Sequence, residues 1–449
     1  MIENGVKDLP SSMVSCLIDG EEAQILELGM EGFIFRIDNR IEDIQRIQVN
    51  YFFLEDSVYE ERTLQEFQVN EIEEKEFFYV IEIKTNDNEY RERTGRLLRE
   101  YGKYITCKSM DDSYCASEIA GYPVEFDETF METFEEQRRE WFEERKLVEE
   151  DKKQWIQVMN NLELAIAIDR PDRYTSYMEK DWEDYCKYYW EQQNLEWHPI
   201  SKKKVGCIYI GNTFCHKLFP KEKELFTMME KARNNGTQIV VVFSYLRDCY
   251  VETTKRLLER LEEWCTRYQV VMEIVVNDLG LLQLLVGKEK WFKISLGELL
   301  NKRRKDPRLS YKLGYEQQAS LLKENALNTK EYQELLDSYG VQEYEYESCS
   351  YPIKLNNRKA HLHFPYYQTN TSQYCTLYAK CHNGDRGKQK LVKNCPYYCR
   401  EWVFLYPKHL KMVGYYNTLF GLDDQILKEY TILQAYVAQG LTRIVSNLL

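Results

Sequence analysis

Four cysteines in the C-terminal part of the chain have a type and spacing that could bind a metal. Cys381, Cys395 and Cys399 fall within the segment CHNGDRGKQKLVKNCPYYC, and Cys215 lies far upstream, just after the apolar run CIYIGN. Four thiolates from two loops suit either zinc or a 4Fe-4S cluster. Zinc sites usually show two close Cys-x-x-Cys pairs, which this chain lacks, so the irregular spacing favours the cluster. Cys375 lies near the trio and is an alternative to Cys381.

Four polar residues outside the cysteines are candidates for substrate binding. Asp278 follows the apolar run VMEIVVN and precedes Leu-Gly, where it could face a binding site or simply cap a helix. Asn370 and Asn417 follow expected strands. Arg308 ends the basic stretch NKRRKDPR, which could hold an anionic substrate or be an ordinary solvated loop.

Two histidines alternate along one expected strand. His361 and His363 are two residues apart in AHLHF, so both side chains point to the same face. They could line a barrel lumen, but ordinary hydrogen-bonded histidines are the favoured interpretation.

The elements that would position these residues alternate between strands and helices from about residue 161. Continuous apolar runs alternating with helices indicate a parallel sheet covered on both faces. Eight expected strands favour a closed (β/α)8 barrel, whose loops after the strand C-termini carry function. A doubly wound sheet is the alternative, but no Gly-x-Gly-x-x-Gly turn is present. The expected strands are 162–169, 205–212, 238–245, 271–278, 291–297, 341–347, 360–367 and 412–416.

The N-terminal part has a different pattern. Residues 1–125 read as a small β-barrel or sandwich domain built of short strands rich in β-branched and aromatic residues. Residues 126–160 contain apolar residues at near-helical spacing and no glycine or proline from Asp127 onward, which predicts one connecting helix. The barrel then occupies residues 161–449.

The charge distribution and the composition of the chain limit its expected partners and cellular location. Residues 1–160 carry 39 acidic and 19 basic side chains, whereas residues 161–449 carry 35 acidic and 41 basic. Mutual attraction of the two parts is the favoured interpretation, and binding of an anion such as RNA by the second is the alternative. The N-terminal segment does not resemble a signal peptide and no apolar run is long enough to cross a membrane, so we expect a cytoplasmic protein with reduced thiols.

The barrel part resembles the collagenase-like peptidase family, peptidase family U32. The segments that carry the resemblance are IYIGNTFC, VVNDLGLLQLL, LGELLNKRRKDPR and AKCHNGDRGKQKLVKNCPYYC. The branch that looks closest comprises accessory proteins of ubiquinone biosynthesis, and this implies that Cys215, Cys381, Cys395 and Cys399 hold a 4Fe-4S cluster. The resemblance covers about residues 161–449 and does not extend to residues 1–160.

The N-terminal domain faintly resembles PilZ domains around the segment LGMEGFIFRI. Glu27 and Gly29 stand where the Asp-x-Ser-x-x-Gly motif of that family has Asp and Ser, and no Arg-x-x-x-Arg pair precedes them. The resemblance therefore implies an interaction module for a protein partner, without binding of cyclic di-GMP.

Three functions are consistent with this sequence. Members of the family are called peptidases or collagenases, or assist oxygen-independent hydroxylation of a quinone precursor or of RNA bases. The chain has no His-Glu-x-x-His and no Gly-x-Ser-x-Gly, so a hydroxylation-type modification of RNA or a small molecule is the leading hypothesis. A peptidase-like hydrolase and a noncatalytic scaffold that senses iron or redox state are the alternatives. A polar barrel lumen would favour an enzyme, and an aliphatic lumen the scaffold.

Overall fold

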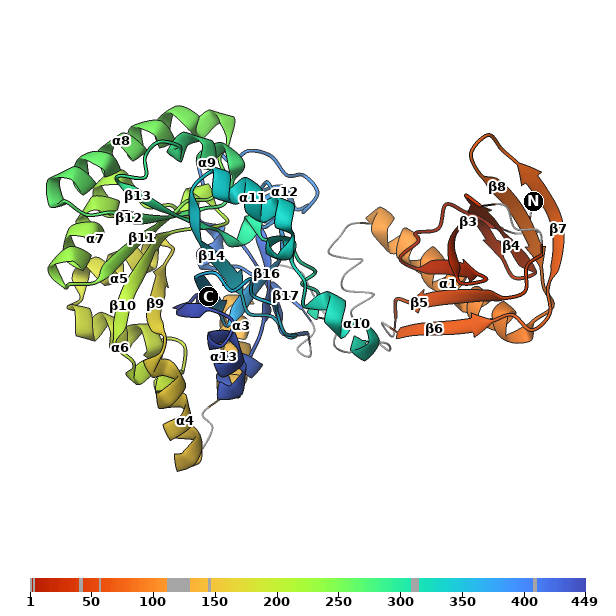
Figure 1. The fold of residues 1–449 in the computed structure, drawn as a ribbon, viewed down its shortest axis with the longest axis horizontal. Helices are drawn as coiled ribbons and strands as arrows, with labels where there is room; N and C mark the ends of the chain where they lie inside the picture. The colour runs from red at the N-terminus through yellow and green to blue at the C-terminus, as the bar shows by residue number, and fades with distance from the viewer. Residues whose placement is uncertain are drawn as a thin grey trace. The chain divides into compact units, whose positions relative to one another are not determined.

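The computed structural model describes most of the chain and divides it into two compact units. One unit comprises Met1–Val124 with Arg308–Glu316, and the other comprises Glu125–Pro307 with Gln317–Leu449 (Figure 1). The described residues are 2, 5–39, 43–55, 58–110, 130–143, 147–307, 315–406 and 410–449.

The N-terminal unit is built on an antiparallel sheet, which confirms the predicted small β domain. Its strands follow the order β6-β5-β2-β3-β4-β8-β7, with β1 paired to β3. Buried and part-exposed side chains alternate along β2, as expected for a sheet with one face in a core. The strands are β1 (Val6–Lys7), β2 (Val14–Ile18), β3 (Glu21–Gly29), β4 (Gly32–Ile37), β5 (Ile47–Phe53), β6 (Val58–Thr63), β7 (Gln68–Glu74) and β8 (Tyr79–Lys84).

A long helix in this unit was not predicted from the sequence. Helix α1 (Asn88–Met110) contacts β5 and β3, and Tyr90 and Leu97 are fully buried in the shared core. The Tyr90 hydroxyl donates to the carbonyl oxygens of Gly29 (2.8 Å) and Gly32 (2.9 Å). The helix is rich in charged residues, so its apolar stripe is too sparse to stand out in the sequence.

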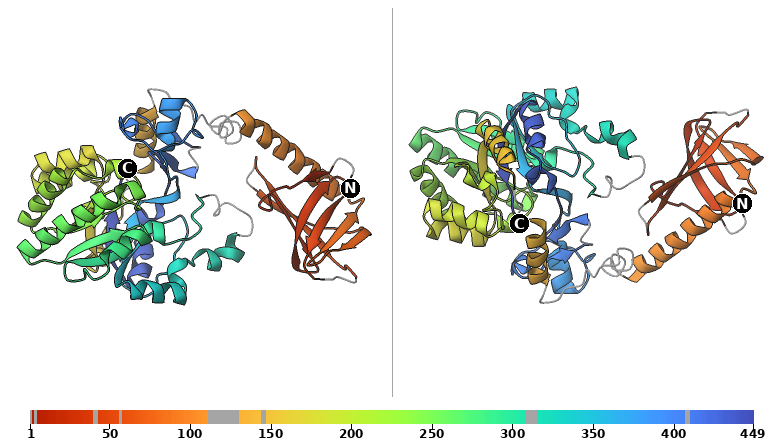
Figure 2. Two further views of the ribbon diagram at one scale, coloured as in Figure 1. Left: turned by 90° about the horizontal axis from the view of Figure 1, so that it is seen from above. Right: turned by 90° about the horizontal axis from the view of Figure 1, so that it is seen from below.

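The second unit is a closed barrel of eight parallel strands, as predicted. Its order is β10-β11-β12-β13-β14-β15-β20-β9, and the helices between strands lie on its outside (Figure 2). The strands are β9 (Glu163–Ile168), β10 (Val205–Gly211), β11 (Gln238–Val242), β12 (Met272–Val276), β13 (Phe292–Leu296), β14 (Val341–Glu347), β15 (Ala360–Phe364) and β20 (Leu441–Ser446). The helices between or beside them are α5 (Pro171–Glu179), α6 (Trp182–Glu191), α7 (Glu222–Asn234), α8 (Val251–Tyr268), α9 (Leu279–Leu285), α10 (Tyr315–Leu322), α11 (Lys330–Ser338) and α13 (Tyr430–Val437).

The identity of the eighth barrel strand corrects the sequence prediction. Residues 412–416 were expected to close the barrel, but β20 closes it by pairing with β15 and β9. The sequence of β20, LTRIVS, carries Arg443 in its middle, so it does not read as a continuous apolar run. The side chain of Arg443 is nevertheless buried, because it pairs with carboxylates inside the barrel.

The predicted strand at 412–416 instead belongs to a small antiparallel sheet inserted between β15 and β20. This sheet has the order β16-β19-β18-β17 and carries the cysteine-rich loop between its first and second strands in the chain. Its elements are β16 (Tyr366–Thr371), α12 (Thr376–Asn383), the 3-10 turn η7 (Tyr398–Arg400), β17 (Phe404–Leu405), β18 (Met412–Tyr415) and β19 (Thr418–Leu422).

The predicted connecting helix is two helices in the structure. Helix α3 (Phe130–Trp141) and helix α4 (Glu149–Asn160) are separated by residues that include the non-helical Phe142 and Val148. Trp155 of α4 is fully buried, with its ring 4.7 Å from that of His198. The apolar positions that suggested one long helix therefore serve two helices that pack on the barrel unit.

Membrane insertion has no support in the helices. Among the residues that the structure describes, none of the helices combines the length and the apolar character needed to cross a bilayer.

Gly211, at the end of strand β10, can be substituted to test the backbone constraint just before the loop that carries Cys215. Gly211 has a φ of +126°, and a Cβ there would lie 2.1 Å from the Val242 carbonyl oxygen. We expect Gly211→Ala to lower the free energy of unfolding by about 3 kcal/mol, because it combines an unfavourable backbone conformation with a backbone clash. Gly236→Ala is the control: its φ is +66°, but a Cβ would meet no atom within 4 Å, so about 1 kcal/mol is expected in urea unfolding. Equal losses would show that the β10–β11 contact is not a constraint.

Candidate functional site at the barrel mouth

The lumen of the barrel has one polar and one apolar side. Small or apolar inward residues, mainly from β9, β10 and β11, form one buried cluster. Facing them, carboxylates and histidines from β12, β14 and β15 are buried in the same lumen. The apolar cluster consists of Ala165, Ala167, Cys207, Tyr209, Val240, Val242, Val275 and Val445.

Glu345 lies at the centre of the polar side and is completely buried. Its Oε1 accepts hydrogen bonds from Ser295 Oγ (2.6 Å) and from the Tyr209 hydroxyl (3.3 Å). His361 Nδ1 lies 3.0 Å from Oε1, and His363 Nε2 lies 2.8 Å from Oε2. Burial alone would raise the pKa of Glu345, but the two histidines outweigh it and hold the pKa well below its usual value. Glu345 is therefore an ionised carboxylate in the middle of the barrel.

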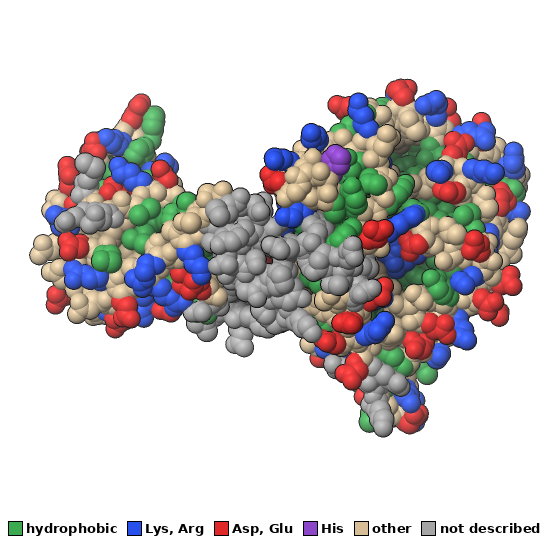
Figure 3. Space-filling view, turned by 180° about the vertical axis from the view of Figure 1, so that it is seen from behind, with side chains coloured by type: hydrophobic (Ala, Val, Ile, Leu, Met, Phe, Trp, Pro, Cys, Tyr) green, Lys and Arg blue, Asp and Glu red, His purple; other side chains and the backbone are tan. Residues whose placement is uncertain are grey.

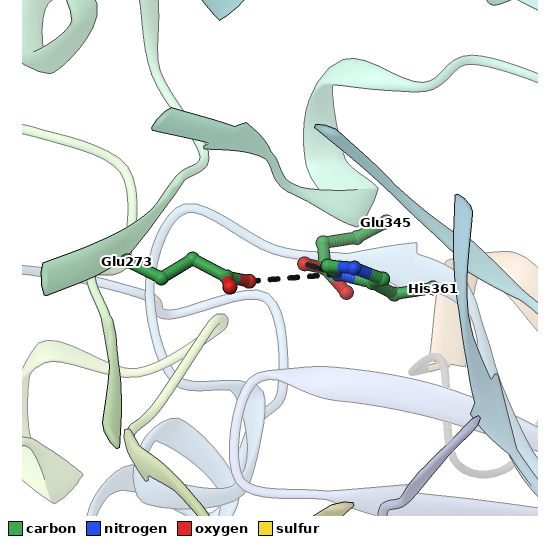
Figure 4. A group of neighbouring side chains, drawn as sticks. All are labelled: Glu273, Glu345 and His361. Atoms are coloured by element: carbon green, nitrogen blue, oxygen red, sulfur yellow. Dashed lines mark hydrogen bonds and ion pairs between the residues drawn. The ribbon is translucent and has the colours of Figure 1, made fainter. Parts of the chain in front are cut away.

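One group in the lumen has the composition of a metal site. Ligand atoms of Glu273, Glu345 and His361 all lie within 4.8 Å of one another (Figure 4). Arg443 Nη1, however, is 2.7 Å from Glu273 Oε1 and 3.0 Å from the Tyr209 hydroxyl. The Arg443 guanidinium already supplies the positive charge that balances these carboxylates, so we interpret the group as a buried ion network.

His363 connects Glu345 to a second acidic residue nearer the mouth. His363 Nδ1 is 3.1 Å from Glu298 Oε1, and Glu298 Oε2 accepts a hydrogen bond from Thr213 Oγ1 at 3.0 Å. Burial alone would lower the pKa of His363, but the carboxylates of Glu298 and Glu345 outweigh it and raise the pKa to about 9. Burial raises the pKa of Glu298, although His363 acts against this. Two carboxylates with opposite shifts thus flank a protonated imidazole, an arrangement suited to general acid–base chemistry.

The acid–base groups form a continuous series through the lumen. From Glu298 and His363 the contacts run through Glu345 to His361, whose Nε2 is 3.5 Å from Glu343 Oε2. The series of contacts therefore extends from the mouth to the amino-terminal end of the barrel, where Glu343 pairs with the part-exposed Lys293.

A pocket of about 540 Å³ opens where the series reaches the mouth. Glu298 lines it beside Asn277, and Lys305 lines another wall. Lys305 is itself buried and pairs with Glu347 while donating to Gln368 Oε1 (2.7 Å). A buried acid–base residue at the wall of a polar pocket is the usual composition of an active site.

Four cysteines gather beside this pocket, and Cys375 is one of them. Burial raises the pKa of Cys399 well above its usual value, and the neighbouring thiols of Cys215, Cys375 and Cys395 raise it further. Burial raises the pKa of Cys215 to about 11, with Cys395 adding to the effect. Cys375 likewise has a raised pKa, first from burial and then from Cys215 and Cys395. We call Cys215, Cys375, Cys395 and Cys399 the cysteine quartet.

Cys381, the fourth ligand expected from the sequence, lies in a different environment. Burial raises its pKa to about 12, and the charges that act on it are those of Glu401 and Lys380. Cys375 is the N-cap residue of α12, and Cys381 follows six residues later in the same helix. Six residues correspond to about 240° of rotation and about 9 Å of rise, so the two thiols cannot face the same partner. Cys215 and Cys395 act on Cys375, whereas Glu401 and Lys380 act on Cys381, so Cys375 is a second candidate for the fourth ligand beside Cys381.

The quartet fits a cluster better than a single zinc ion. Tetrahedral zinc with Zn–S bonds of about 2.3 Å would hold its sulfurs about 3.8 Å apart. Within the described ranges, the group with ligand atoms inside 4.8 Å of one another is Glu273, Glu345 and His361, and it contains no cysteine. A cubane, which places four iron atoms between the thiolates, requires wider spacing. A donor set of four thiols, with Cys399 buried and the other three partly exposed, is of the kind that a 4Fe-4S cluster takes.

Hydrogen bonds hold the Cys215 loop against the inserted sheet. Asn212 Oδ1 accepts from the Cys215 backbone N–H (2.7 Å), and Asn417 Nδ2 donates to the carbonyl oxygens of Phe214 and Ser372 (both 2.9 Å). Asn417 was a candidate substrate contact, but the structure places it in this buried clamp. The loop therefore has a fixed position relative to the other three cysteines.

The remaining candidates occupy varied places. Asn370 is exposed and lines the mouth pocket, so its side chain can contact a substrate bound there. Asp278 caps α9 by accepting from the N–H groups of Gly280 (2.6 Å) and Leu281 (3.2 Å), as in the capping alternative. Arg308 lies outside the described residues.

Sequence reasoning missed the acidic members of the site. The strand sequence VQEYEYE places Glu343, Glu345 and Glu347 at alternate positions, the same period that singled out His361 and His363. Two adjacent strands with polar residues at alternate positions would have indicated a polar lumen. Glu298 carries no such signal, because it lies in a short turn after β13.

Comparison with known proteins gives limited information. No family model matches the chain, and no curated protein matches it. The chain distantly resembles a solved U32 peptidase, Mk0906, with 9% sequence identity and a TM-score of 0.29 over 64% of this chain and 94% of the other. It also resembles an uncharacterized Legionella protein, Lpg0364, with 11% identity and a TM-score of 0.18 over 23% of this chain and 99% of the other. Neither likeness is close enough to define a family for this chain.

Two buried histidines allow the charge state of the site to be tested. Burial lowers the pKa of His198 to about 4, whereas the carboxylates around His363 raise its pKa to about 9. Nuclear magnetic resonance of labelled histidines at pH 7 should show His363 protonated and His198 neutral. Because the pKa of folded His363 exceeds its ordinary value of 6.5, its stabilising effect is complete below that pH and is lost as pH rises through about 9. A neutral His363 at pH 7 would contradict the proposed network, and Glu345→Gln should lower its pKa.

Proposed function

We propose that this protein is an enzyme that uses a 4Fe-4S cluster, held by the cysteine quartet, in a hydroxylation-type modification of RNA or a small molecule. The observation that carries the proposal is the placement of four thiols, one of them buried and three partly exposed, beside a pocket whose wall contains an acid–base residue. Tyr245 and Gln373 line both the mouth pocket and the smaller cavity that contains Cys215 and Cys375. The two parts therefore share a wall.

The two parts match the needs of such a reaction. Hydroxylation with water as the oxygen source converts R–H and H₂O to R–OH and releases two electrons and two protons. When bound, the cluster supplies one-electron transfer, and an electron-acceptor protein would receive the electrons. The protons require groups of the protein itself.

Glu298 is the residue that we assign to take the proton from water at the pocket. The protonated His363, whose Nδ1 lies 3.1 Å from Glu298 and whose Nε2 lies 2.8 Å from Glu345, favours the ionised form of Glu298 that this step requires. Thr213, which donates to Glu298, follows Asn212 in the loop that carries Cys215. Lys305 and Asn370 line the same pocket and would orient a polar or anionic substrate.

The polar lumen separates this proposal from the scaffold hypothesis. A scaffold would be stabilised by a lumen of packed aliphatic side chains, because buried ion pairs are costly to desolvate. Retention of an ion network that leads to the pocket instead favours catalysis. A peptidase-like hydrolase could use the same Glu298 and His363 but would not need the quartet, so activity that survives loss of iron would favour it.

The N-terminal unit is proposed as a module for a protein partner. Its strand β7 is exposed along its whole length, and it lies at one end of the sheet order. An exposed edge strand offers unpaired backbone groups to another chain. This role is independent of the site in the barrel.

The ligand set can be tested by comparing two cysteines from the same helix. Protein purified without oxygen should contain about four iron atoms and four sulfides per chain. Cys375→Ala should lose most of the iron, and Cys381→Ala should retain it, because only Cys375 lies among the other thiols. Cys265→Ala, a buried cysteine on α8, is the control and should retain iron. Loss of iron in Cys381→Ala with retention in Cys375→Ala would restore the set expected from the sequence.

The proposed reaction can be tested in cells that express only one form of the chain. Mass spectrometry of RNA nucleosides and small metabolites should find a species heavier by one oxygen atom with the wild-type chain and not with Cys395→Ala. Glu298→Gln, which keeps the side-chain shape but cannot accept the proton, should reduce that species by about 100-fold while iron content stays normal. Normal amounts of the species in Glu298→Gln would remove this residue from the reaction.

A further inference from the structure

A second cavity shares none of its lining residues with the mouth pocket. It has a volume of about 590 Å³ and is lined by four arginines and by several tyrosines. Burial raises the pKa of Tyr415 in its wall, and Arg170 and Cys399 both act on that tyrosine. Arg400, the residue after Cys399, also lines it. The arginines are Arg138, Arg170, Arg173 and Arg400.

Protein carboxylates neutralise only part of this positive charge. Arg170 Nε pairs with Asp172 (3.1 Å), and Arg173 Nη1 pairs with Asp169 (3.1 Å). Arg138 Nη1 donates to an oxygen of Leu449, the last residue of the sequence, at 2.9 Å, and the Glu135 carboxylate also lines the cavity and acts on Arg138. In the part of the chain that the structure describes, Arg400 forms no ion pair with a carboxylate.

Several buried polar atoms of the lining have no partner within the described chain. These include Arg170 Nη1, Arg138 Nε and the hydroxyl of Tyr185, whose side chain is only 1% exposed. Burial lowers the pKa of Arg138, and the charges of Arg170 and Arg173 lower it further. Buried donors without acceptors cost free energy, so guanidinium groups held together in this way call for an anion.

The backbone at this cavity also favours binding of an anion. Helix α5 begins at this cavity with Pro171; its N-cap residue Arg170 makes no side-chain cap, and the Asp172 carboxylate lies in its first turn. The amino-terminal end of a helix carries a partial positive charge and free N–H groups. Arginine forks bind the paired oxygens of a phosphate particularly well.

We propose that this cavity binds the phosphate groups of a phosphorylated small molecule at the flank of the cysteine quartet. Arg170 and Arg138 would hold the phosphate oxygens in the buried part, and the exposed Arg400 would close over them from the rim. The inference is independent of the cluster and of the proposed reaction, because it depends on the arginines alone.

Isothermal titration calorimetry of the full chain with pyrophosphate tests the site. Because pyrophosphate can also chelate iron, the titration is made in the Cys395→Ala background as well as in the wild-type chain. One saturable site is expected in both. Binding in the wild-type chain alone would assign the heat to iron and overturn the proposal.

Substitutions of the lining locate the site. Arg170→Gln and Arg400→Gln should each weaken pyrophosphate binding by about tenfold, as expected for loss of a charge-assisted hydrogen bond. Arg400 is exposed, so its variant should fold even if Arg170→Gln does not. Arg233→Gln, on the surface of α7, is the matched control and should bind as the wild type. Absence of saturable binding, or unchanged affinity in Arg400→Gln, would overturn the proposal.

Two further ligands distinguish the sources of the phosphate. A nucleoside diphosphate that binds more tightly than pyrophosphate would identify a nucleotide site in which a tyrosine ring stacks on the base. Ribose 5-phosphate that binds as tightly as the nucleotide would identify a sugar-phosphate site. Both results support a phosphate site and fix its class.

Discussion

A carboxylate buried in the middle of a barrel is the constraint on which the rest of this site depends. An ionised Glu345 without partners would cost several kcal/mol, so every group around it has to supply a hydrogen bond or a positive charge. Ser295, Tyr209, His361 and His363 do so from three different strands. The same histidines then reach Glu343 and Glu298, and in this way one buried charge organises a series that spans the lumen.

The inserted sheet between β15 and β20 places cysteines beside the acid–base residues of the barrel. It carries three of the four clustered cysteines to the mouth, while the fourth comes from the loop after β10. Asn417 joins these two parts through carbonyl oxygens on both sides. Because the Cys215 loop also contains Thr213, which contacts Glu298, the thiols and the acid–base residues are positioned by one short segment.

Four arginines of the barrel unit are concentrated in one cavity, and its basic residues do not form a broad patch on the face shown in Figure 3. Figure 3 shows acidic and basic side chains interspersed over the barrel unit on the face that it presents. The excess of basic residues in the second part of the sequence is therefore not gathered into one broad patch on this face. Arginines instead concentrate in a cavity, where low polarity makes each guanidinium more effective toward an anion than it would be in water.

The sequence by itself determined the class of fold and predicted a candidate thiol site. Apolar runs alternating with helices require a covered parallel sheet, and seven of the eight barrel strands were predicted from the sequence. The eighth, β20, was not, because Arg443 interrupts its apolar run and is buried only through partners on other strands. The choice between Cys375 and Cys381 was likewise left to tertiary structure. Both are near the other cysteines in sequence, but they lie on different sides of helix α12, and only the docking of that helix decides which thiol faces Cys215.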